Sequence, residues 1–485
     1  MSKSVALLLL LVLSFSSIIT FIPVHAESKT IIVPDDFATI SAAIEHAAEG
    51  DTIYVKRGRY EILKNETLMI NKTLSIIGED AATTLLSGPG FAYGAVQANN
   101  EGNNNARYTL LRVETSPSNF ILPPKVAFQV NADNFKISQM TIDNCDIGIS
   151  VSGNGTEVSN TKMTSVSVSG SHSLISDNTI TGTLTMRGSY QTITRNFGYI
   201  DTDGSFNTIA ENAAHSDINL KGSANIITGN SFSTMYLEYA DSNTISNNSL
   251  SCLYVGFYGH ACSNNTFSNN RVTGPGIWGI LMGAGAYNVF HDNLLSNYTV
   301  SYDGYGIAIG GNHLVAEHNT FYRNILINNN KHVSANWEIL GAGNYWDNGE
   351  EGNYWDDYIG TDSNGDGIGD VPYTVEGSAW DDDAGGHVSF VFGQDNYPLM
   401  APFDIDGVSI KLPEWASPSS EPSTEPQPET TELFPTSVVA ASVAAVVVGA
   451  GLLVYFKKYR RQCDSNDLSG DRVSVSSMAE KSMLL

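Results

Sequence analysis

The sequence predicts an all-β chain folded as a right-handed parallel β-helix solenoid. One asparagine recurs at intervals of 16 to 26 residues, and an apolar residue stands three positions before most of its occurrences. Apolar and polar residues alternate between these points, which is a strand pattern. A repeat of this length is typical of solenoids. The recurring residues are Asn160, Asn178, Asn196, Asn212, Asn230, Asn248, Asn270, Asn293 and Asn319.

Asparagine suits a corner that every coil must repeat, because it accepts a left-handed backbone more easily than other non-glycine residues. Stacked coils also let the side-chain amides hydrogen-bond in a column. A left-handed β-helix leaves little room for repeats of 26 residues, and a leucine-rich repeat needs leucines where Thr, Ser and Asn stand here. Aligning Gly188, Gly204 and Gly222 predicts one interior and one outward column. The interior column is Leu184, Ile200, Ile218 and Tyr236, and the outward column is Arg187, Asp203 and Lys221.

The N-terminus reads as a signal peptide, residues 1–26, with Lys3 before an apolar run and a small residue, Ala26, at its end. A predicted β-helix domain occupies residues 27–345. It opens with an amphipathic helix from about Thr39 to Gly50, which we interpret as a cap over the open end of the solenoid.

The C-terminal region predicts a membrane anchor. After a cap at 346–405, residues 406–437 form a stalk rich in Pro, Ser, Thr and Glu, which cannot bury enough apolar surface to fold. An uninterrupted run without charges at 438–456 is long enough for a transmembrane helix. Basic residues follow at once in the tail, 457–485, so the positive-inside rule places that tail in the cytoplasm and the large N-terminal domain outside. The sequence thus predicts a single-pass cell-membrane protein.

Charge and cysteine content narrow the functional classes. The formal net charge of −26 argues against nucleic-acid binding, because this excess of acidic residues leaves no basic surface to bind phosphates. Cys252 and Cys262 flank a short excursion and are either a disulfide or two buried free thiols. Six sequons offer N-glycosylation sites on an exported chain. They are Asn65, Asn71, Asn154, Asn247, Asn264 and Asn297.

The chain resembles a known family over about residues 29–403. The opening "TIIVPDDFATISAAIEHAAEGDTIYVKRGRYE", the Asn-punctuated coils, and the closing "GNYWDDYIGTDSNGDGIGDVPYTV" and "DNYPLMAPF" are similar to NosD-like right-handed β-helix proteins. This group is also described as carbohydrate-binding and sugar-hydrolase repeats, and it is common among anchored surface proteins of archaea. The resemblance implies the fold strongly. Its members include polysaccharide-acting enzymes and a factor for copper insertion, so it implies function weakly.

The string "DSNGDGIGD" predicts a structural Ca²⁺ site. Side-chain oxygens stand at alternate positions, a glycine allows a tight turn, and a backbone carbonyl completes the set. An ordinary acidic turn is the alternative, because the glutamate expected at loop position twelve is absent. Asp356 or Asp357 could supply a missing ligand. The predicted ligands are Asp362, Asn364, Asp366, Ile368 and Asp370.

Carbohydrate chemistry has two sets of candidate residues. Asp201 and Asp203 lie two apart on one strand and are weak candidates for catalytic carboxylates, but we favour mutual support with Arg187 and Lys221 as their role. Aromatic residues gather in the widened coils, where they either bind glycan or fill the core. These are Tyr254, Phe257, Tyr258, Trp278, Tyr302 and Tyr305.

The sequence therefore predicts a membrane-anchored, non-catalytic scaffold that binds glycans or envelope components and contains structural Ca²⁺. A polysaccharide lyase or hydrolase is the main alternative. A role in copper-site maturation is a third, but the histidines and methionines are scattered singly and form no copper motif by spacing.

Overall fold

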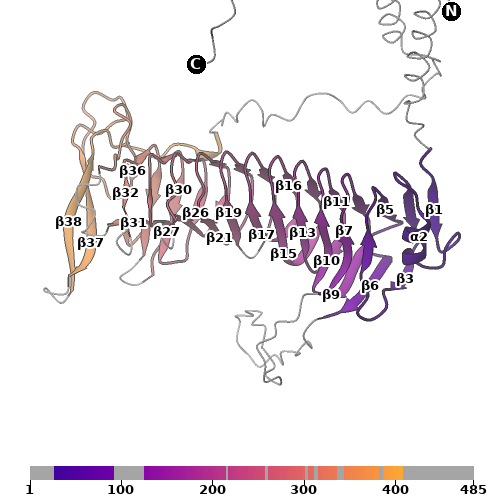
Figure 1. The fold of residues 1–485 in the computed structure, drawn as a ribbon. Coiled ribbons are helices and arrows are strands. Elements are labelled where there is room, and N and C mark those ends of the chain that lie inside the picture. The colour runs from indigo at the N-terminus through magenta and orange to yellow at the C-terminus, as the bar shows by residue number, and fades with distance from the viewer. Residues whose placement is uncertain are drawn as a thin grey trace, which may run out of the picture. The chain divides into compact units, whose positions relative to one another are not determined.

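The computed structural model describes residues 27–91, 125–214, 217–256, 260–300, 304–310, 315–335, 343–381 and 386–407. These residues form a right-handed parallel β-helix built almost entirely of strands, in which the coils add one strand each to the first long sheet and one or two to the second (Figure 1). The first long sheet has 13 strands. They are β1 (Thr30–Val33), β2 (Thr52–Val55), β5 (Ser75–Gly78), β8 (Lys136–Ser138), β11 (Glu157–Ser159), β14 (Leu174–Ser176), β16 (Thr192–Thr194), β18 (Thr208–Ala210), β20 (Ile226–Thr228), β22 (Thr244–Ser246), β25 (Thr266–Ser268), β29 (Val289–His291) and β33 (Thr320–Tyr322).

The second long sheet has 16 strands and carries the widest outer face. Its strands are β3 (Gly58–Glu61), β4 (Leu68–Ile70), β6 (Thr84–Gly90), β7 (Val126–Val130), β9 (Thr141–Cys145), β10 (Ile147–Ser152), β12 (Lys162–Met163), β13 (Val166–Ser169), β15 (Thr179–Arg187), β17 (Phe197–Asp203), β19 (Ile218–Lys221), β21 (Thr234–Leu237), β24 (Cys252–Val255), β27 (Trp278–Met282), β31 (Tyr305–Ile309) and β35 (Lys331–Ala335).

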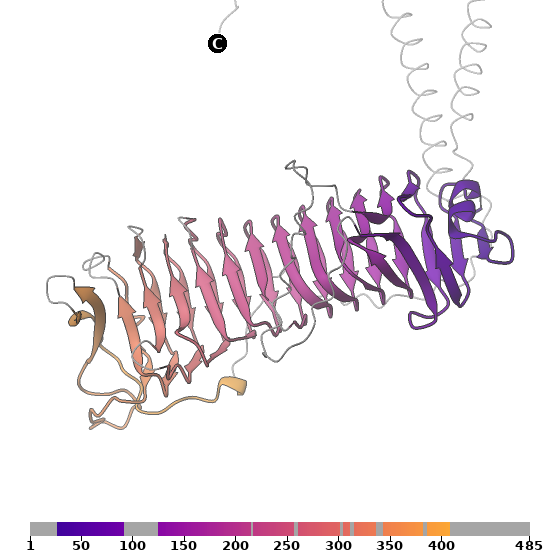
Figure 2. The same ribbon diagram turned by 90° about the horizontal axis from the view of Figure 1, so that it is seen from below.

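Shorter sheets complete the later coils. Five strands pair in the order β23 (Ser249–Leu250), β26 (Arg271–Thr273), β30 (Leu294–Ser296), β34 (Ile325–Ile327) and β36 (Tyr354–Trp355), and β28 (Gly285–Ala286) pairs with β32 (Ala316–Glu317). An antiparallel hairpin, β37 (Tyr373–Asp381) with β38 (Gly386–Asp395), follows the last coil. The chain then runs back along the solenoid to a short 3-10 helix, η3 (Ile405–Gly407), where Asp406 forms an ion pair with Arg271 (Figure 2).

The capping helix α2 (Ile40–His46) contacts β1 and β2 and buries Ile40, Ala43 and Ile44. The side chain of Thr39 accepts a hydrogen bond from Ala42 N, as an N-cap does. The helix ends earlier than the predicted Gly50, because Ala47 is extended. Beyond Ala47, Asp51 accepts from the backbone N–H of Ala48 and turns the chain into β2.

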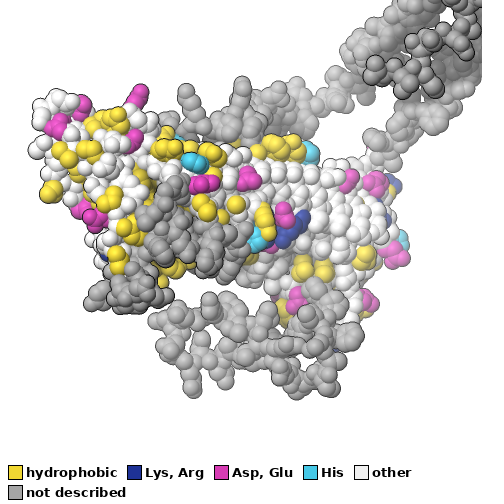
Figure 3. All heavy atoms as spheres, turned by 60° about the vertical axis from the view of Figure 1, so that its left-hand side comes forward, with side chains coloured by type: hydrophobic (Ala, Val, Ile, Leu, Met, Phe, Trp, Pro, Cys, Tyr) yellow, Lys and Arg dark blue, Asp and Glu magenta, His cyan; other side chains and the backbone are white. Residues whose placement is uncertain are grey.

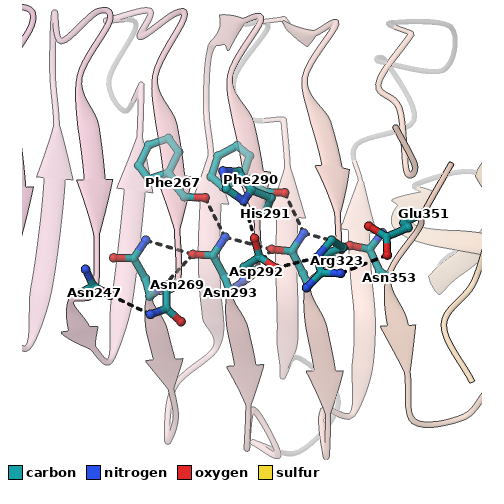
Figure 4. Close-up of polar contacts among 12 residues, drawn as sticks. Asn247, Phe267, Asn269, Phe290, His291, Asp292, Asn293, Arg323, Glu351 and Asn353 are labelled. Atoms are coloured by element: carbon teal, nitrogen blue, oxygen red, sulfur yellow. Dashed lines mark hydrogen bonds and ion pairs between the residues drawn. The ribbon is translucent and has the colours of Figure 1, made fainter. Parts of the chain in front are cut away.

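The predicted asparagine column exists, with two corrections to its membership. It begins at Thr161, whose N–H donates to Asn178 Oδ1, so the exposed Asn160 lies outside it. Asn319 also lies outside it. Each buried amide donates its Nδ2 to the Oδ1 of the next member and accepts from the preceding one, as Figure 4 shows for the part of the ladder that includes Asn293 and Asn353. The first ladder is Asn178, Asn196, Asn212, Asn230, Asn248, Asn270, Asn293, Asn324 and Asn353.

A second asparagine ladder, not predicted, runs along another corner and contains Asn319. Its amides are hydrogen-bonded from one coil to the next in the same way. In both ladders the left-handed backbone belongs to the residue before the asparagine, for example Arg195 (φ 52°) before Asn196, and not to the asparagine itself as expected. The second ladder is Asn207, Asn225, Asn243, Asn265, Asn288, Asn319 and Asn344.

Exposed aromatic rings stand at several of the left-handed corner positions beside the second ladder and in the coils before it. His172, Tyr190 and Phe206 stack in turn, with centroids 5.1 Å apart at each step. Tyr287 and His318 stack in a later pair of coils. Figure 3 shows hydrophobic and histidine side chains along this edge. Because the faces of these rings are turned toward each other, they leave mainly edges for solvent.

The predicted register holds in most of the interior. Leu184, Ile200 and Ile218 pair in one column and are buried. Tyr236 does not join them, since Ile218 pairs with Met235 and Tyr236 therefore points outward. A second interior column is a stack of rings, Phe267, Phe290, Phe321 and Trp346, with successive centroids 4.4, 4.7 and 4.8 Å apart.

The buried carboxylate of Asp395 closes the first asparagine ladder. Its Oδ2 accepts from Asn353 N (2.7 Å) and Trp355 Nε1 (2.8 Å), and its Oδ1 accepts from Tyr397 N (3.0 Å). A Cβ on Gly352 would lie 1.7 Å from Asp395 Oδ1, so only glycine fits there. These contacts join the two closing motifs, because Gly352, Asn353 and Trp355 belong to "GNYW" and Asp395 and Tyr397 belong to "DNY".

Residues 1–26 and 408–485 lie outside the described residues, and with them the predicted signal peptide, most of the stalk, the membrane segment and the tail. Among the described residues, none of the helices has the length and apolar character needed to cross a membrane.

Candidate functional site: an outer face and a C-terminal pocket

The outer face of the 16-stranded sheet presents polar and aromatic side chains in register. Asp201 pairs with Asn219 on the next strand, Asn219 with Tyr236, and Tyr236 with Tyr254. All four are partly exposed, because alternate residues of these strands point away from the core. The strands β17, β19, β21 and β24 thus carry one continuous outward column.

Ion pairs organise the basic residues of this face. Arg187 binds Asp201 (2.6 Å) and not Asp203, while Lys221 binds Glu238 (3.0 Å). Asn219 Nδ2 also donates to Asp201 Oδ1 at 3.4 Å. The outward column predicted for Arg187, Asp203 and Lys221 is therefore in register, but the basic residues pair with Asp201 and Glu238, and Asp203 is exposed.

Asp217, which the sequence did not single out, is the most perturbed carboxyl group on this face. It lies just before β19, and burial raises its pKa while hydrogen bonds from Thr234 oppose the shift. Burial likewise raises the pKa of Tyr199, with Asp201 and Asp217 adding to the effect. A carboxyl group with a raised pKa beside other carboxylates is a common property of functional sites. In the sequence, Asp217 stands two residues before Asn219, the residue that pairs with Asp201 on the next strand.

Two of the predicted aromatic residues belong to this face. Tyr254 stacks on Tyr236 (4.8 Å, 13° between planes), and Trp278 meets Tyr254 edge to face at 6.5 Å. Burial raises the pKa of Tyr254. Tyr305 is 5% exposed and packs in the structure's interior, so it is not available to a ligand. The other three, Phe257, Tyr258 and Tyr302, lie outside the described residues.

A pocket of about 870 Å³ lies between the last coil and the hairpin. His332 of β35 enters it almost fully buried, and two adjacent carboxylates after β36 meet the ring. His332 Nε2 lies 2.9 Å from Asp356 Oδ1 and 3.3 Å from Asp357 Oδ1. Stacked rings of Trp355 and Tyr373 (4.4 Å) form part of the lining.

Hydrogen bonds determine the electrostatics of this pocket. The bond with His332 is the main cause of the lowered pKa of Asp357, and the Tyr373 hydroxyl donates to the same carboxylate at 3.2 Å. Burial raises the pKa of Tyr373. Asp356 Oδ2 accepts from Asn328 N at 2.5 Å. Asp356 and Asp357 thus lie beside His332. The sequence had suggested them as additional ligands for the Ca²⁺ loop.

The predicted Ca²⁺ loop is closed by its own hydrogen bonds. Asp362 accepts from Gly365 N (2.7 Å) and Gly367 N (2.9 Å), as in a tight turn. Asn364 Nδ2 donates to Asp366 Oδ2 (2.8 Å). Asp370 accepts from both the backbone and the hydroxyl of Ser363, which lowers its pKa. Ile368 pairs with Leu399, which ties the loop to the end of the chain's described part.

Cys252 and Cys262 are free thiols, and the predicted disulfide is not formed. Cys252 lies on the outer face of β24, whereas Cys262 is fully buried with its Sγ near Ala240 N. Burial raises the pKa of these thiols to about 12 and about 11. The six sequon asparagines are all exposed, including those that precede the buried ladder members Asn248 and Asn265.

The family described as a right-handed beta helix region matches residues 199–349. No curated protein matches this sequence. Among solved structures, the chain is similar to the A-module of mannuronan C-5 epimerase AlgE4 from Azotobacter vinelandii, with 12% identity, a TM-score of 0.43 and coverage of 64% of this chain and 96% of that chain. It is also similar to the PL6 family alginate lyase AlyGC (14%, 0.44, 82% and 60%) and to the catalytic domain of a GH87 α-1,3-glucanase (13%, 0.45, 67% and 69%).

Proposed function

We propose that this chain is a cell-surface scaffold that binds a glycan on the outer face of its 16-stranded sheet, without turnover. The observation that carries the proposal is the outward column of Asp201, Asn219, Tyr236 and Tyr254, with Trp278 beside it. A sugar ring has C–H groups on its faces and hydroxyls on its rim. Aromatic side chains with polar tips, next to carboxylates and an amide, match both features.

The rest of the chain suits the same setting. The export signal, stalk and apolar segment at 438–456 predicted from the sequence would hold the face outside a membrane. A structural Ca²⁺ in the loop around Asp362 and Asp366 would stiffen the cap. This proposal agrees with the resemblance to NosD-like surface proteins, and it does not require the protein to catalyse a reaction.

The test is binding of the full-length protein to a panel of acidic and neutral polysaccharides. Truncation of Tyr236 or Tyr254 to alanine should weaken binding at least about tenfold, because buried aromatic contacts dominate such interfaces. Tyr190→Ala removes an exposed ring from the other edge and should leave binding unchanged. Binding that persists in the Tyr236→Ala and Tyr254→Ala variants would move the site elsewhere.

Asp217 supports hydrolysis as a second candidate function. Its raised pKa suits a general acid. It stands diagonally across neighbouring strands from Asp201, a placement that separates side chains by about 7–8 Å. Inverting glycosidases separate their two carboxyl groups by about 6.5–9.5 Å. New reducing ends that appear with the wild-type protein and disappear with Asp217→Asn would replace the scaffold proposal by this one.

A further inference from the structure

The C-terminal pocket gathers three side chains with metal-ligand chemistry. One ligating atom from each of His332, Asp356 and Asp357 lies within 4.8 Å of the other two. Among the described residues, this is the group of three or more His, Cys, Asp and Glu side chains that meets that condition. The calcium-loop carboxylates do not form such a group, and the outer face contributes nothing to it.

We propose that His332, Asp356 and Asp357 bind a divalent metal ion of the Zn²⁺ type at the floor of this pocket. Zn²⁺ binds imidazole nitrogen and carboxylate oxygen at about 2.0–2.2 Å, so tetrahedral ligands lie roughly 3.4 Å apart. The two separations from His332 Nε2, 2.9 and 3.3 Å, are close to that value. The ion would lie between Nε2 and the two carboxylate oxygens, which are all within 4.8 Å of one another.

In each of the two carboxylates, one oxygen faces His332 and the other accepts a hydrogen bond from another residue. Asp357 turns Oδ1 to His332, and its Oδ2 accepts from the Tyr373 hydroxyl. Asp356 turns Oδ1 to the same ring, and its Oδ2 accepts from Asn328 N. Outer hydrogen bonds of this kind orient metal-binding carboxylates.

Charge balance also favours an ion over a proton. One imidazole carries at most one positive charge and faces two carboxylates that repel each other, whereas a divalent cation neutralises both. Binding at Nε2 moves the ring proton to Nδ1, which lies 3.5 Å from Asn329 Nδ2. That separation is at the outer limit of a hydrogen bond, and Asn329 Nδ2 already donates to Leu295 O, so little is lost.

The donor set indicates the class of metal and leaves room for a further ligand. One imidazole with two carboxylates suits Zn²⁺ or Mn²⁺, while copper(I) prefers thiolates and thioethers. Three protein ligands leave at least one position open toward the pocket, as in sites where water or a substrate oxygen completes the shell. The ligand chemistry expected there is an oxygen donor such as water, a sugar hydroxyl or a uronate.

The experiment is calorimetric titration of the metal-free full-length protein with Zn²⁺, followed by measurement of the bound metal after dialysis. We expect one equivalent of tight binding and a higher melting temperature with Zn²⁺. His332→Gln and Asp357→Asn should each reduce affinity at least tenfold and abolish the thermal shift. Asp362→Asn, in the calcium loop, is the matched control and should retain both.

The Asp357 side chain is 60% exposed, so its substitution by the isosteric amide tests the site even if His332→Gln fails to fold. Folding of each variant is verified by circular dichroism. Wild-type protein that retains no Zn²⁺, or equal Zn²⁺ affinity in wild type and Asp357→Asn, would overturn the assignment. Neither result depends on whether the outer face binds glycan.

Discussion

Removal of one amide from the first ladder tests the principal stabilising contact of the solenoid. Asn230 is 1% exposed, and its Oδ1 accepts from Asn212 N (2.9 Å) and Asn212 Nδ2 (3.0 Å). Its Nδ2 donates to Ile209 O (2.9 Å), Thr228 O (3.1 Å) and Asn248 Oδ1 (2.9 Å). The Asn230→Ala variant therefore loses contacts to the coil on either side.

The magnitude follows from which groups remain unpaired. Asn212 N loses its acceptor and becomes a buried orphan, which costs about 1–3 kcal/mol. Asn212 Nδ2 keeps two carbonyl acceptors, and Asn248 Oδ1 still accepts from the backbone of residue 230, so the remaining losses are smaller. We expect a destabilisation of roughly 1–3 kcal/mol, and a similar one for Asn248→Ala.

Thermal and urea unfolding of the full-length protein measure the effect. Asn219→Ala is the control, because this amide is on the outer face with one long contact, and we expect a change of about 0.5 kcal/mol or less. Solenoids can unfold in segments, so coincidence of two spectroscopic probes is required before a free energy is calculated. An Asn230→Ala variant as stable as Asn219→Ala would show that the ladder does not hold the coils together.

Three further predictions concern other parts of the chain. Chelation should lower the melting temperature and Ca²⁺ should restore it, because binding adds about 2.7 kcal/mol to the free energy of unfolding at a hundredfold excess over the dissociation constant. Asp366→Ala should abolish the response, and identical melting in chelator and Ca²⁺ would show that the loop is an ordinary acidic turn. Burial raises the pKa of Asp395 from 3.8 to about 6, so this group's contribution is full below about pH 4 and falls as the pH rises through 6, by about 3 kcal/mol. Asp395→Asn should flatten this part of the stability profile relative to wild type, and an unchanged slope would contradict the assignment. Truncation before Val438 should release a secreted protein, and its retention with membranes would refute the predicted anchor.

The repeat made the register predictable but left the corner ambiguous. Leu184, Ile200 and Ile218 followed from aligned glycines, because a slip of one residue would turn every side chain to the other face. At the corners, however, a left-handed residue and a ladder asparagine are adjacent, and pairs such as Asn247 and Asn248 give each position the same residue type. Spacing alone therefore could not separate the left-handed position from the ladder position at a corner.

The sites that the sequence did not predict depend on contacts between coils. Asp395 reaches Asn353 only because the chain returns to the solenoid after the hairpin, and the alternation within each motif does not reveal that return. His332 appears in the sequence as one of several single histidines. Its carboxylate partners become neighbours only after β35 and the turn beyond β36 are stacked, which requires the lengths of the intervening loops.

The lengths of the coils explain why these candidate sites lie where they do. Between Asn178 and Asn248 successive ladder members are 16 or 18 residues apart, whereas the last two steps, Asn293 to Asn324 and Asn324 to Asn353, take 31 and 29. The ladder fixes the corner, because each amide must meet the next, so additional residues leave the coil as loops. The short coils therefore present uniform sheet faces, and the outward column of Asp201, Asn219 and Tyr236 lies on one of them. The pocket around His332 forms beyond the long coils, where the residues after β36 and the hairpin β37–β38 supply walls outside the sheets of the solenoid.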